Sequence, residues 1–311
     1  MHQTSGRWKY GLLLAFITSF MWGVLPIALK GLLLYMDSVT ITWYRFFIAL
    51  IVIFSFLFFK NKLPTKKILS SRFILLLLFI STVGLLANYI LYMSGLEHST
   101  PEGAQLMIQI APMLLLLGSL WLFKESFNLW QSFGVISFVL GLILFFNHRL
   151  HELTSIESDY GYGVFLVFLA AILWAFYALA QKQLLSYLSS VQVMMIIFLF
   201  GSILFLPYSE PALIQNLDLL GWVLLLFCGA NTVIAYGAFS ESLAHWEASR
   251  VSAILSITPL ITLLSVHITH HYFPDYIQAE ELNNLSILGA LLVVFGSAGV
   301  ALIRSKEVKT T

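Results

Sequence analysis

Long apolar segments alternate with short polar connections along the whole chain of 311 residues. Ten of these segments are each close to the ~20 residues that a helix needs to cross the ~30 Å hydrocarbon core of a bilayer. Their apolar runs are continuous rather than alternating, so we predict helices and not the strands of a barrel. The predicted spans are residues 10–30, 38–59, 73–95, 103–123, 127–147, 160–181, 191–208, 219–240, 250–269 and 284–303.

Composition supports a membrane protein, because 59% of the residues are hydrophobic and only 10% are charged. In ordinary soluble domains about a quarter of the residues are charged. The net charge of +1 and the lack of an Arg/Lys stripe predict no nucleic-acid partner. Cys228 is the single cysteine, which excludes an internal disulfide, and we interpret it as a buried bystander thiol.

Positive charges predict the orientation of the spans. With both termini in the cytoplasm and ten alternating spans, 13 of the 16 Lys and Arg residues fall on the cytoplasmic side. Lys30 and Arg149 fall outside, and Arg45 lies within a span. An odd number of spans would place the two basic ends on opposite sides. We therefore predict a multi-pass protein of the inner (plasma) membrane with cytoplasmic N- and C-termini.

The first half of the chain recurs in the second half. One set of matches has an offset of 152 positions, as from 11 to 163: Gly11, Trp22, Gly23 and Lys30 match Gly163, Trp174, Ala175 and Lys182. Further matches are Tyr89 and Pro112 with Tyr236 and Pro259, and Gly134 and Gly141 with Gly289 and Gly296. Each copy holds five spans, which is an odd number, so the two copies are inverted relative to each other. We predict repeats at 1–150 and 160–305, followed by a tail at 306–311.

These residues resemble the drug/metabolite transporter superfamily, specifically the EamA-type ten-helix transporters. The resemblance rests on Trp22-Gly23 with Lys30, Arg45, the prolines of spans four and nine, Lys124-Glu125, and the glycines of spans five and ten. It implies an all-α membrane bundle of two inverted five-helix repeats around a central cavity, lined mainly by the first four helices of each. It also implies transport of small metabolites across an inner membrane.

Repeat two departs from this pattern in two places. His270, His271 and Tyr272 stand where a counterpart of Glu125 is expected, and the counterpart of Arg45 falls near Ile196 and Ile197. The two halves have therefore diverged, and these two charges occur in repeat one alone.

Arg45 is the only formal charge well inside a span. An embedded guanidinium costs at least ~3 kcal/mol on insertion scales, so another interaction must offset it. One interpretation is an anchor for a carboxylate in the cavity. The other is an arginine that snorkels to the outer end of the span and pairs with a phosphate or a carbonyl.

Gln105 and Gln109 are four residues apart and share one helix face, just before Pro112. Pro112 removes a helix hydrogen bond near the middle of the bilayer, where inverted-repeat carriers hold their substrates. The counterparts in repeat two are Ser252, Ser256 and Pro259. Substrate contact and hydrogen bonding between helices are both open for these side chains.

Aromatic and amide residues provide further candidates for substrate binding. Span three carries Asn88, Tyr89 and Tyr92, span eight carries Asn231 and Tyr236, and Trp22, Trp174 and Tyr177 sit mid-span, away from the interfacial belt. Contacts that only join helices are an equal alternative. We interpret the glycines of spans five and ten as structural scaffold or a dimer seam.

The sequence contains few candidate residues for binding an ion or a cofactor. Glu241 is the best candidate for proton coupling, although a solvated position beside His245 is the simpler explanation. His267, His270, His271 and Asp275 could form a metal cluster, but a polar loop explains them better, and we predict no metal and no cofactor.

We therefore expect a secondary transporter that exports small organic metabolites such as amino acids by alternating access. Its partners would be a small-molecule substrate and the lipid bilayer, and it would act as a monomer or homodimer. The alternatives are an importer or facilitator of a small carboxylate or nucleotide-like metabolite, and a non-transporting scaffold or channel. An enzyme is not expected, because no nucleophile motif or carboxylate dyad occurs within the spans.

Overall fold

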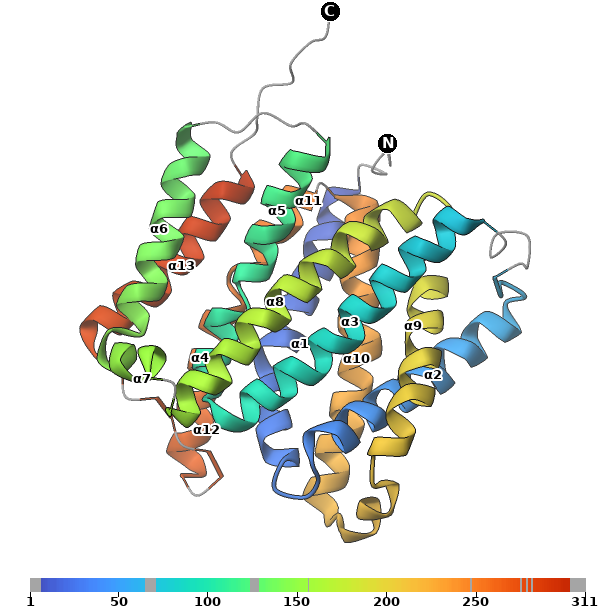
Figure 1. Ribbon diagram of the computed structural model, residues 1–311, viewed down its shortest axis with the longest axis horizontal. Helices are drawn as coiled ribbons and strands as arrows, with labels where there is room; N and C mark the ends of the chain where they lie inside the picture. Colours follow the sequence, from blue (N-terminus) through green and yellow to red (C-terminus); the bar gives the residue numbers. More distant parts are fainter. Residues whose placement is uncertain are drawn as a thin grey trace, which may run out of the picture.

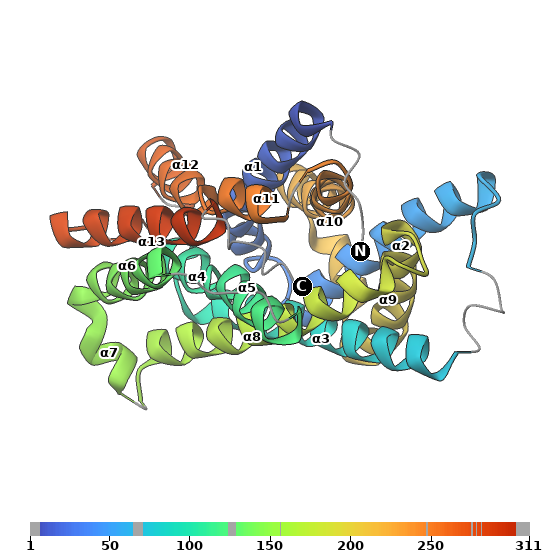
Figure 2. The same cartoon turned by 90° about the horizontal axis from the view of Figure 1, so that it is seen from above.

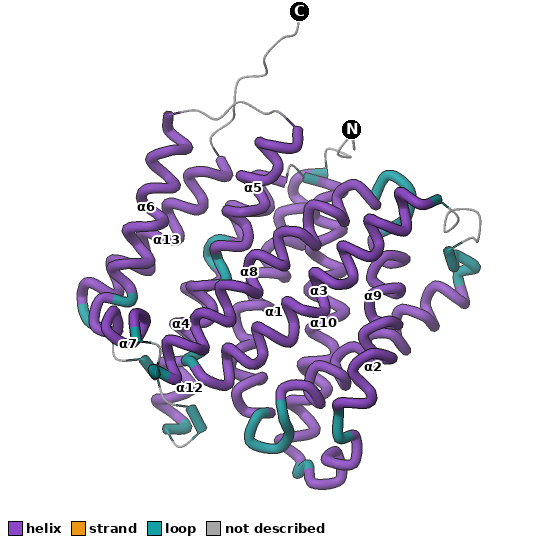
Figure 3. The backbone as a smooth tube through the Cα atoms, viewed as in Figure 1, coloured by secondary structure: helices purple, strands orange, loops and turns teal. Residues whose placement is uncertain are grey.

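The computed structural model describes residues 7–64, 71–123, 129–155, 157–246, 248–274, 276–277, 279–280 and 282–302. Throughout these ranges every regular element is a helix (Figure 3). Eight of the predicted spans are single helices: α1 (Trp8–Leu32), α2 (Ser38–Phe59), α3 (Arg72–His98), α6 (Leu129–Phe145), α8 (Asp159–Leu184), α9 (Ser190–Phe205), α10 (Leu219–His245) and α13 (Asn284–Leu302).

Spans four and nine are each broken into two helices. Span four consists of α4 (Pro101–Met107) and α5 (Ile110–Phe123), and span nine consists of α11 (Ala248–Leu255) and α12 (Thr258–Tyr272). In the described part of the chain, seven segments pass a length and hydropathy test for a membrane span, with α11 and α12 taken together. The fold is thus an all-α membrane bundle of two inverted five-helix repeats.

Both breaks come directly before a proline. Pro112 and Pro259 lack an N–H, so each removes the helix bond to the carbonyl four residues earlier and crowds that carbonyl. Those carbonyls belong to Ile108 and Leu255, which lie at the two breaks. The proline pair of the sequence repeat therefore produces a pair of interrupted helices.

Polar side chains mark where several spans begin. Asp37 accepts hydrogen bonds from the backbone nitrogens of Val39 and Thr40, both at 2.9 Å. Ser189 and Gln192 form a reciprocal capping box at the start of α9. Such caps satisfy the first N–H groups of a helix, which would otherwise lack partners as the chain enters the lipid.

The helix packing repeats itself when the two halves are exchanged. Helix α1 packs against α10, and its counterpart α8 packs against α3. The pairs α2–α9 and α6–α13 each join a helix to its own counterpart. Figure 2 shows α6 and α13 side by side at one edge of the bundle, and α2 and α9 side by side at the opposite edge. This exchange symmetry is the one expected of an inverted repeat.

The glycines of spans five and ten meet each other within the chain. A Cβ added to Gly141 would lie 2.7 Å from the carbonyl oxygen of Gly289, and one added to Gly134 would lie 2.9 Å from that of Gly296. Only glycine allows α6 and α13 to approach this closely. The structure therefore makes these glycines part of the scaffold that joins the two repeats.

The first turn of α1 and the last turn of α13 lie at the same end of the bundle (Figure 1). At the other end, the connection predicted as a plain polar stretch holds two short helices, η2 (Asn147–Arg149) and α7 (Leu150–Thr154). The connection between α9 and α10 likewise contains η3 (Leu206–Tyr208) and η4 (Pro211–Asn216).

Large apolar side chains cover the outside of the bundle. Phe20, Phe54, Phe79, Leu226 and Phe295 are all exposed. An apolar surface of this extent would cause association in water, whereas in a bilayer it faces acyl chains.

Candidate functional site

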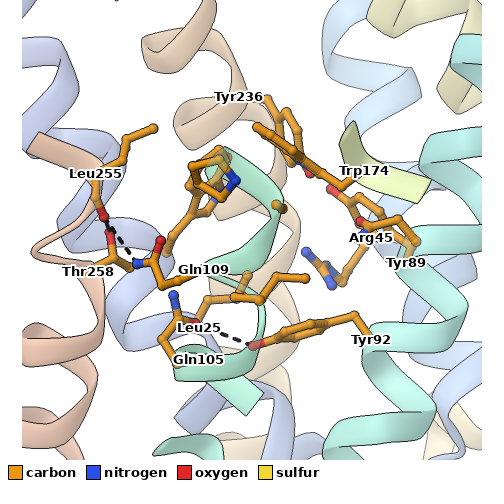
Figure 4. Close-up of a pocket in the computed structure, with 15 residues that line it drawn as sticks. Leu25, Arg45, Tyr89, Tyr92, Gln105, Gln109, Trp174, Tyr236, Leu255 and Thr258 are labelled. Carbon is orange, nitrogen blue, oxygen red and sulfur yellow. Dashed lines mark hydrogen bonds between the residues drawn. The ribbon is translucent and has the colours of Figure 1, made fainter. Parts of the chain in front are cut away.

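A cavity of about 120 Å³ lies inside the bundle, where the two interrupted helices approach each other (Figure 4). Its lining residues come from both repeats, and repeat one contributes the larger share. They are Trp22, Leu25, Arg45, Asn88, Tyr89, Tyr92, Gln105, Ile108, Gln109, Ala111, Pro112, Trp174, Tyr236, Leu255 and Thr258.

Arg45 turns into this cavity rather than toward the end of α2. Its residue is only 4% exposed, and Figure 4 shows its guanidinium directed toward the middle of the pocket. The Nε atom donates to the Thr232 hydroxyl at 3.1 Å, and the guanidinium carbon lies 4.6 Å from the centre of the Tyr89 ring. Within the described residues no carboxylate pairs with Arg45. The cation is therefore buried, held in place, and without a counter-charge.

The interrupted helices are joined across the cavity at one carbonyl. The oxygen of Leu255, released from its helix bond by Pro259, accepts from the Thr258 hydroxyl at 2.6 Å. It also accepts from Gln109 Nε2 at 3.4 Å. A glutamine of repeat one thus bonds to the broken helix of repeat two. This contact connects the two repeats beside the cavity.

Gln105 lies one turn before Gln109 and also faces the cavity. Its Oε1 accepts a long hydrogen bond of 3.4 Å from the Tyr92 hydroxyl. No partner contacts its Nε2 in the described chain. The amide therefore presents a donor to the cavity.

Aromatic rings form one side of the cavity. The centres of the Trp22 and Tyr236 rings are 5.3 Å apart with an edge-to-face tilt, and those of Tyr89 and Tyr236 are 6.1 Å apart. Trp22 and Trp174 both contact Phe239 from opposite repeats. Such walls offer flat apolar contact together with polar edges.

Nine of the twelve substrate-binding candidates from the sequence line this cavity. They are Trp22, Arg45, Asn88, Tyr89, Tyr92, Gln105, Gln109, Trp174 and Tyr236. Asn88 also donates to the Ala170 carbonyl at 2.9 Å, so part of its amide joins α3 to α8.

The other three candidates lie outside the lining. Tyr177 is fully buried behind Trp174, and its hydroxyl contacts the sulfur of Met194 at 3.4 Å. Asn231 donates to the Met21 carbonyl at 2.6 Å and joins α10 to α1. Ser256 donates to the Ala253 carbonyl at 2.8 Å, within the broken span. Tyr177 and Asn231 thus have contacts that join helices, the alternative that the sequence left open, whereas the bond of Ser256 stays within its own span.

Sequence reasoning missed Leu25, Ile108, Ala111, Leu255 and Thr258. Four of them form two pairs at the repeat offset of 147, Ile108 with Leu255 and Ala111 with Thr258. Residues beside the paired prolines, taken together with their counterparts, would have been a usable signal.

Glu241 lies away from this cavity. Its side chain is 57% exposed and pairs with His245 at 3.0 Å. This is the solvated position that the sequence offered as the simpler explanation. Lys124, Glu125, Asp275 and the tail 306–311 fall outside the described residues.

A second cavity of about 230 Å³ lies between α2, α9 and α10. It is almost wholly apolar and shares Tyr236 with the central cavity. Thr232, which holds Arg45, forms part of its wall. We do not regard this second cavity as the substrate site, because no charged side chain is among the described residues that line it.

A second set of buried charges lies at the end of the bundle opposite the first turn of α1. The Glu280 side chain is 1% exposed, and its carboxylate accepts from Arg149 Nε and from the Thr100 hydroxyl. The Tyr160 hydroxyl donates to the same carboxylate at 3.4 Å. This end cluster, defined here as Thr100, Arg149, Tyr160 and Glu280, joins the α3–α4 corner, the connection between the repeats, α8 and the segment before α13.

Glu102 adjoins the end cluster. One oxygen accepts from the backbone nitrogen of Glu280 at 3.1 Å, and the other has no hydrogen-bond partner in the described structure. Glu102 lies three residues before Gln105, so these two side chains share one face of α4. The sequence reasoning overlooked both acids because neither lies within a predicted span.

Comparison with known proteins identifies the family. The sequence model of the EamA-like transporter family matches residues 9–147 and 161–302. The chain belongs to this family. It is 37% identical to the protein named "Uncharacterized inner membrane transporter YhbE" of Escherichia coli K12 over 287 residues, 92% of this chain and 89% of that protein. It is also 36% identical to an "Uncharacterized transporter" of Haemophilus influenzae. That alignment spans 287 residues, which are 92% of this chain and 93% of the other protein.

A solved crystal structure has the same fold. It covers 94% of this chain and 96% of its own chain, with a TM-score of 0.66 and 15% sequence identity. At this identity the likeness concerns the fold alone. Membership in the EamA-like transporter family makes this chain a transporter of the membrane, which agrees with the resemblance carried by its repeated motifs.

Proposed function

We propose that this protein is an inner-membrane secondary transporter that exports small organic metabolites bearing a carboxylate, the class that includes amino acids. The observation that carries the proposal is Arg45, a buried cation that faces a central cavity and lacks a carboxylate partner in the described residues. A carboxylate on the cargo would supply the missing charge and accept two parallel hydrogen bonds from the guanidinium.

The position of the cavity supports alternating access as the mechanism. Inverted-repeat carriers hold substrate at the midplane beside discontinuous helices. Here both interrupted spans reach the cavity, and the bond from Gln109 to the Leu255 carbonyl links them. In the proposed cycle the two halves rock around the cargo, and this contact changes between the two states.

Counterflow in proteoliposomes tests the proposal. Vesicles holding the purified full-length protein are loaded with one unlabelled member of a panel of amino acids and small carboxylates. Uptake of the same labelled compound is then measured. A carrier gives saturable uptake that internal substrate accelerates. We expect this behaviour for at least one carboxylate, and we expect Arg45→Gln to reduce it at least ~10-fold, a loss of ~1.4 kcal/mol of binding.

Two results would overturn the proposal. Flux that neither saturates nor responds to internal substrate indicates a channel, and no flux of any panel member indicates a scaffold. Lys62→Gln, which removes a charge from an exposed connection, is the matched control and should transport like the unaltered protein.

The direction of transport needs a separate measurement. Export is the direction that we propose, and a measurement in cells tests it. Cells that overproduce an exporter should tolerate a higher load of its cargo and release more of it, whereas an importer gives the opposite result.

A further inference from the structure

The polar groups around the central cavity are mostly hydrogen-bond donors, and one of them carries a full positive charge. We propose that the cavity selects organic monoanions, meaning carboxylates with an apolar body and no ammonium group, over the zwitterions that share the same skeleton. This proposal rests on the proposed function and specifies the charge state of its cargo.

The unused donors gather on one side of the cavity. The Nη atoms of Arg45 form no hydrogen bond within the described chain, since only Nε has a partner. The Tyr89 hydroxyl, on a residue that is 4% exposed, is buried beside the hydroxyls of Tyr236 and Thr232, and no group in the described chain forms a hydrogen bond of normal geometry with it. The Arg45 guanidinium lies against the Tyr89 ring, so charge and hydroxyl belong to one contact region. An orphaned buried donor beside an uncompensated cation is a site for an oxygen anion.

Other donors lie elsewhere around the cavity. The indole nitrogens of Trp22 and Trp174 and Nε2 of Gln105 have no hydrogen-bond partner in the described residues, and all three side chains line the cavity. Carboxylate oxygens offer several lone pairs, so one carboxylate can accept from more than one of these groups.

Acceptors for an ammonium group are scarce by comparison. No aspartate or glutamate is among the described residues that line the cavity. The Leu255 carbonyl is already occupied by Thr258 and Gln109, and Oε1 of Gln105 accepts from Tyr92. Glu102 lies on α4, one turn before Gln105. Its carboxylate accepts a hydrogen bond from the backbone of Glu280 and does not line the cavity. The remaining acceptors are neutral amide and hydroxyl oxygens.

The excess of hydrogen-bond donors over acceptors disfavours a zwitterion because of where its ammonium group must lie. In an α-amino acid the ammonium is attached to the carbon next to the carboxylate. When the carboxylate contacts Arg45, the ammonium is brought within a few ångströms of the guanidinium. Like charges at that separation repel, and burial reduces the screening by water. The same acid without the ammonium avoids this repulsion and brings no unpaired donors.

Charge and volume narrow the ligand further. One guanidinium neutralises one negative charge, so a monoanion leaves the cavity electrically balanced while a dianion does not. A cavity of about 120 Å³ is comparable with the ~150 Å³ engineered cavity that accepts benzene. The apolar body is therefore about one ring or one short branched chain, placed against Trp22, Trp174 and Tyr236.

Four compounds with the same phenyl group test the proposal. They are 3-phenylpropionate (an anion), L-phenylalanine (a zwitterion), 3-phenylpropanamide (neutral) and 2-phenylethylamine (a cation). Dissociation constants are obtained near neutral pH from the ligand-dependent thermal stability of the purified full-length protein. We expect the anion to bind at least ~10-fold tighter than the zwitterion, and the amide and the amine to bind more weakly than the anion.

Two substitutions connect this order to named atoms. Arg45→Gln should abolish the preference for the anion over the amide. Tyr89→Phe removes only the unpartnered hydroxyl and keeps the ring, so it should fold normally and weaken the anion several-fold without affecting the amine. Lys62→Gln removes a distant exposed charge and should leave all four constants unchanged.

The outcomes separate this proposal from the proposed function. If counterflow moves a carboxylate but phenylalanine binds as tightly as phenylpropionate, the monoanion selection is wrong and the transport proposal stands. The same holds if the amide equals the anion, or if Tyr89→Phe leaves the anion unaffected. If no panel member is moved and none of the four compounds binds, the proposed function fails and this inference fails with it.

Discussion

The central cavity and the end cluster both bury charge, but they treat it in opposite ways. At the end cluster, Glu280 accepts from Arg149 and from two hydroxyl groups contributed by separate elements. In the cavity, Arg45 has one hydroxyl partner and one aromatic face, and no acid pairs with it in the described chain. The first arrangement is complete within the chain, whereas the second lacks an anion.

Under the proposed function, this difference separates groups that maintain the fold from groups that bind a ligand. A buried ion pair with all of its hydrogen bonds fixes the elements that contribute to it. A buried cation without a partner lowers stability, and proteins keep such groups where function requires them. The comparison gives an order of effects on the stability of the ligand-free protein, measured as the thermal unfolding midpoint in detergent.

Removing the carboxylate of the end cluster should have the largest effect. Glu280→Ala leaves Arg149 without its buried partner and orphans the hydroxyls of Thr100 and Tyr160. Loss of one partner from a buried pair costs ~3–5 kcal/mol. The Arg149 side chain is 27% exposed and retains Glu152, so we expect about 2–3 kcal/mol and a midpoint several degrees lower.

Glu152→Ala is the matched control for this prediction. It removes the more exposed of the two acids that contact Arg149, and we expect a loss of no more than about 1 kcal/mol. Equal effects of the two substitutions would show that Glu280 is not the centre of the cluster.

Lys30→Met should have an intermediate effect. The ammonium of Lys30 donates to the carbonyls of Leu96, Glu97 and Ser99 at 2.8–2.9 Å, where α3 ends. A lysine at this place satisfies carbonyls that have no helix partner and opposes the negative end of the helix dipole. We expect a loss of about 1–2 kcal/mol, with Lys62→Met unchanged. A midpoint that does not fall would contradict the capping role.

Arg45→Gln should have the smallest effect on the stability of the ligand-free protein, although we propose that it impairs transport. No acid is left unpaired by the substitution, and an uncompensated buried charge is removed. We expect an unchanged or higher midpoint. A loss as large as that for Glu280→Ala would mean that Arg45 maintains the fold, and the contrast between the two regions would be lost.

Repetition in the sequence predicted much of this architecture. All ten spans, the polar joint between the halves and the pairing of Pro112 with Pro259 follow from hydropathy and offset alone, since these depend on local residue type. Most of the cavity could also be anticipated, because a polar residue in mid-membrane has few places to face other than the bundle interior.

Local sequence patterns do not show which neighbour a side chain contacts. Tyr177, Asn231 and Ser256 are as polar as the residues that line the cavity, but the rotation of their helices directs them to Met194, Met21 and Ala253. The end cluster could not be predicted from the sequence for the same reason. Thr100 and Glu280 are 180 positions apart, and no local pattern connects them.

The sequence by itself determined a ten-span inverted repeat with an arginine embedded in a span and a proline in each interrupted helix. Hydrophobic length, charge asymmetry and backbone chemistry act over a few residues, so they can be read without coordinates. Only the tertiary structure decided that Arg45 lacks a carboxylate partner in the described chain while Glu280 has a full set of donors. Charge compensation depends on atoms within a few ångströms in space, and packing between distant helices places those atoms.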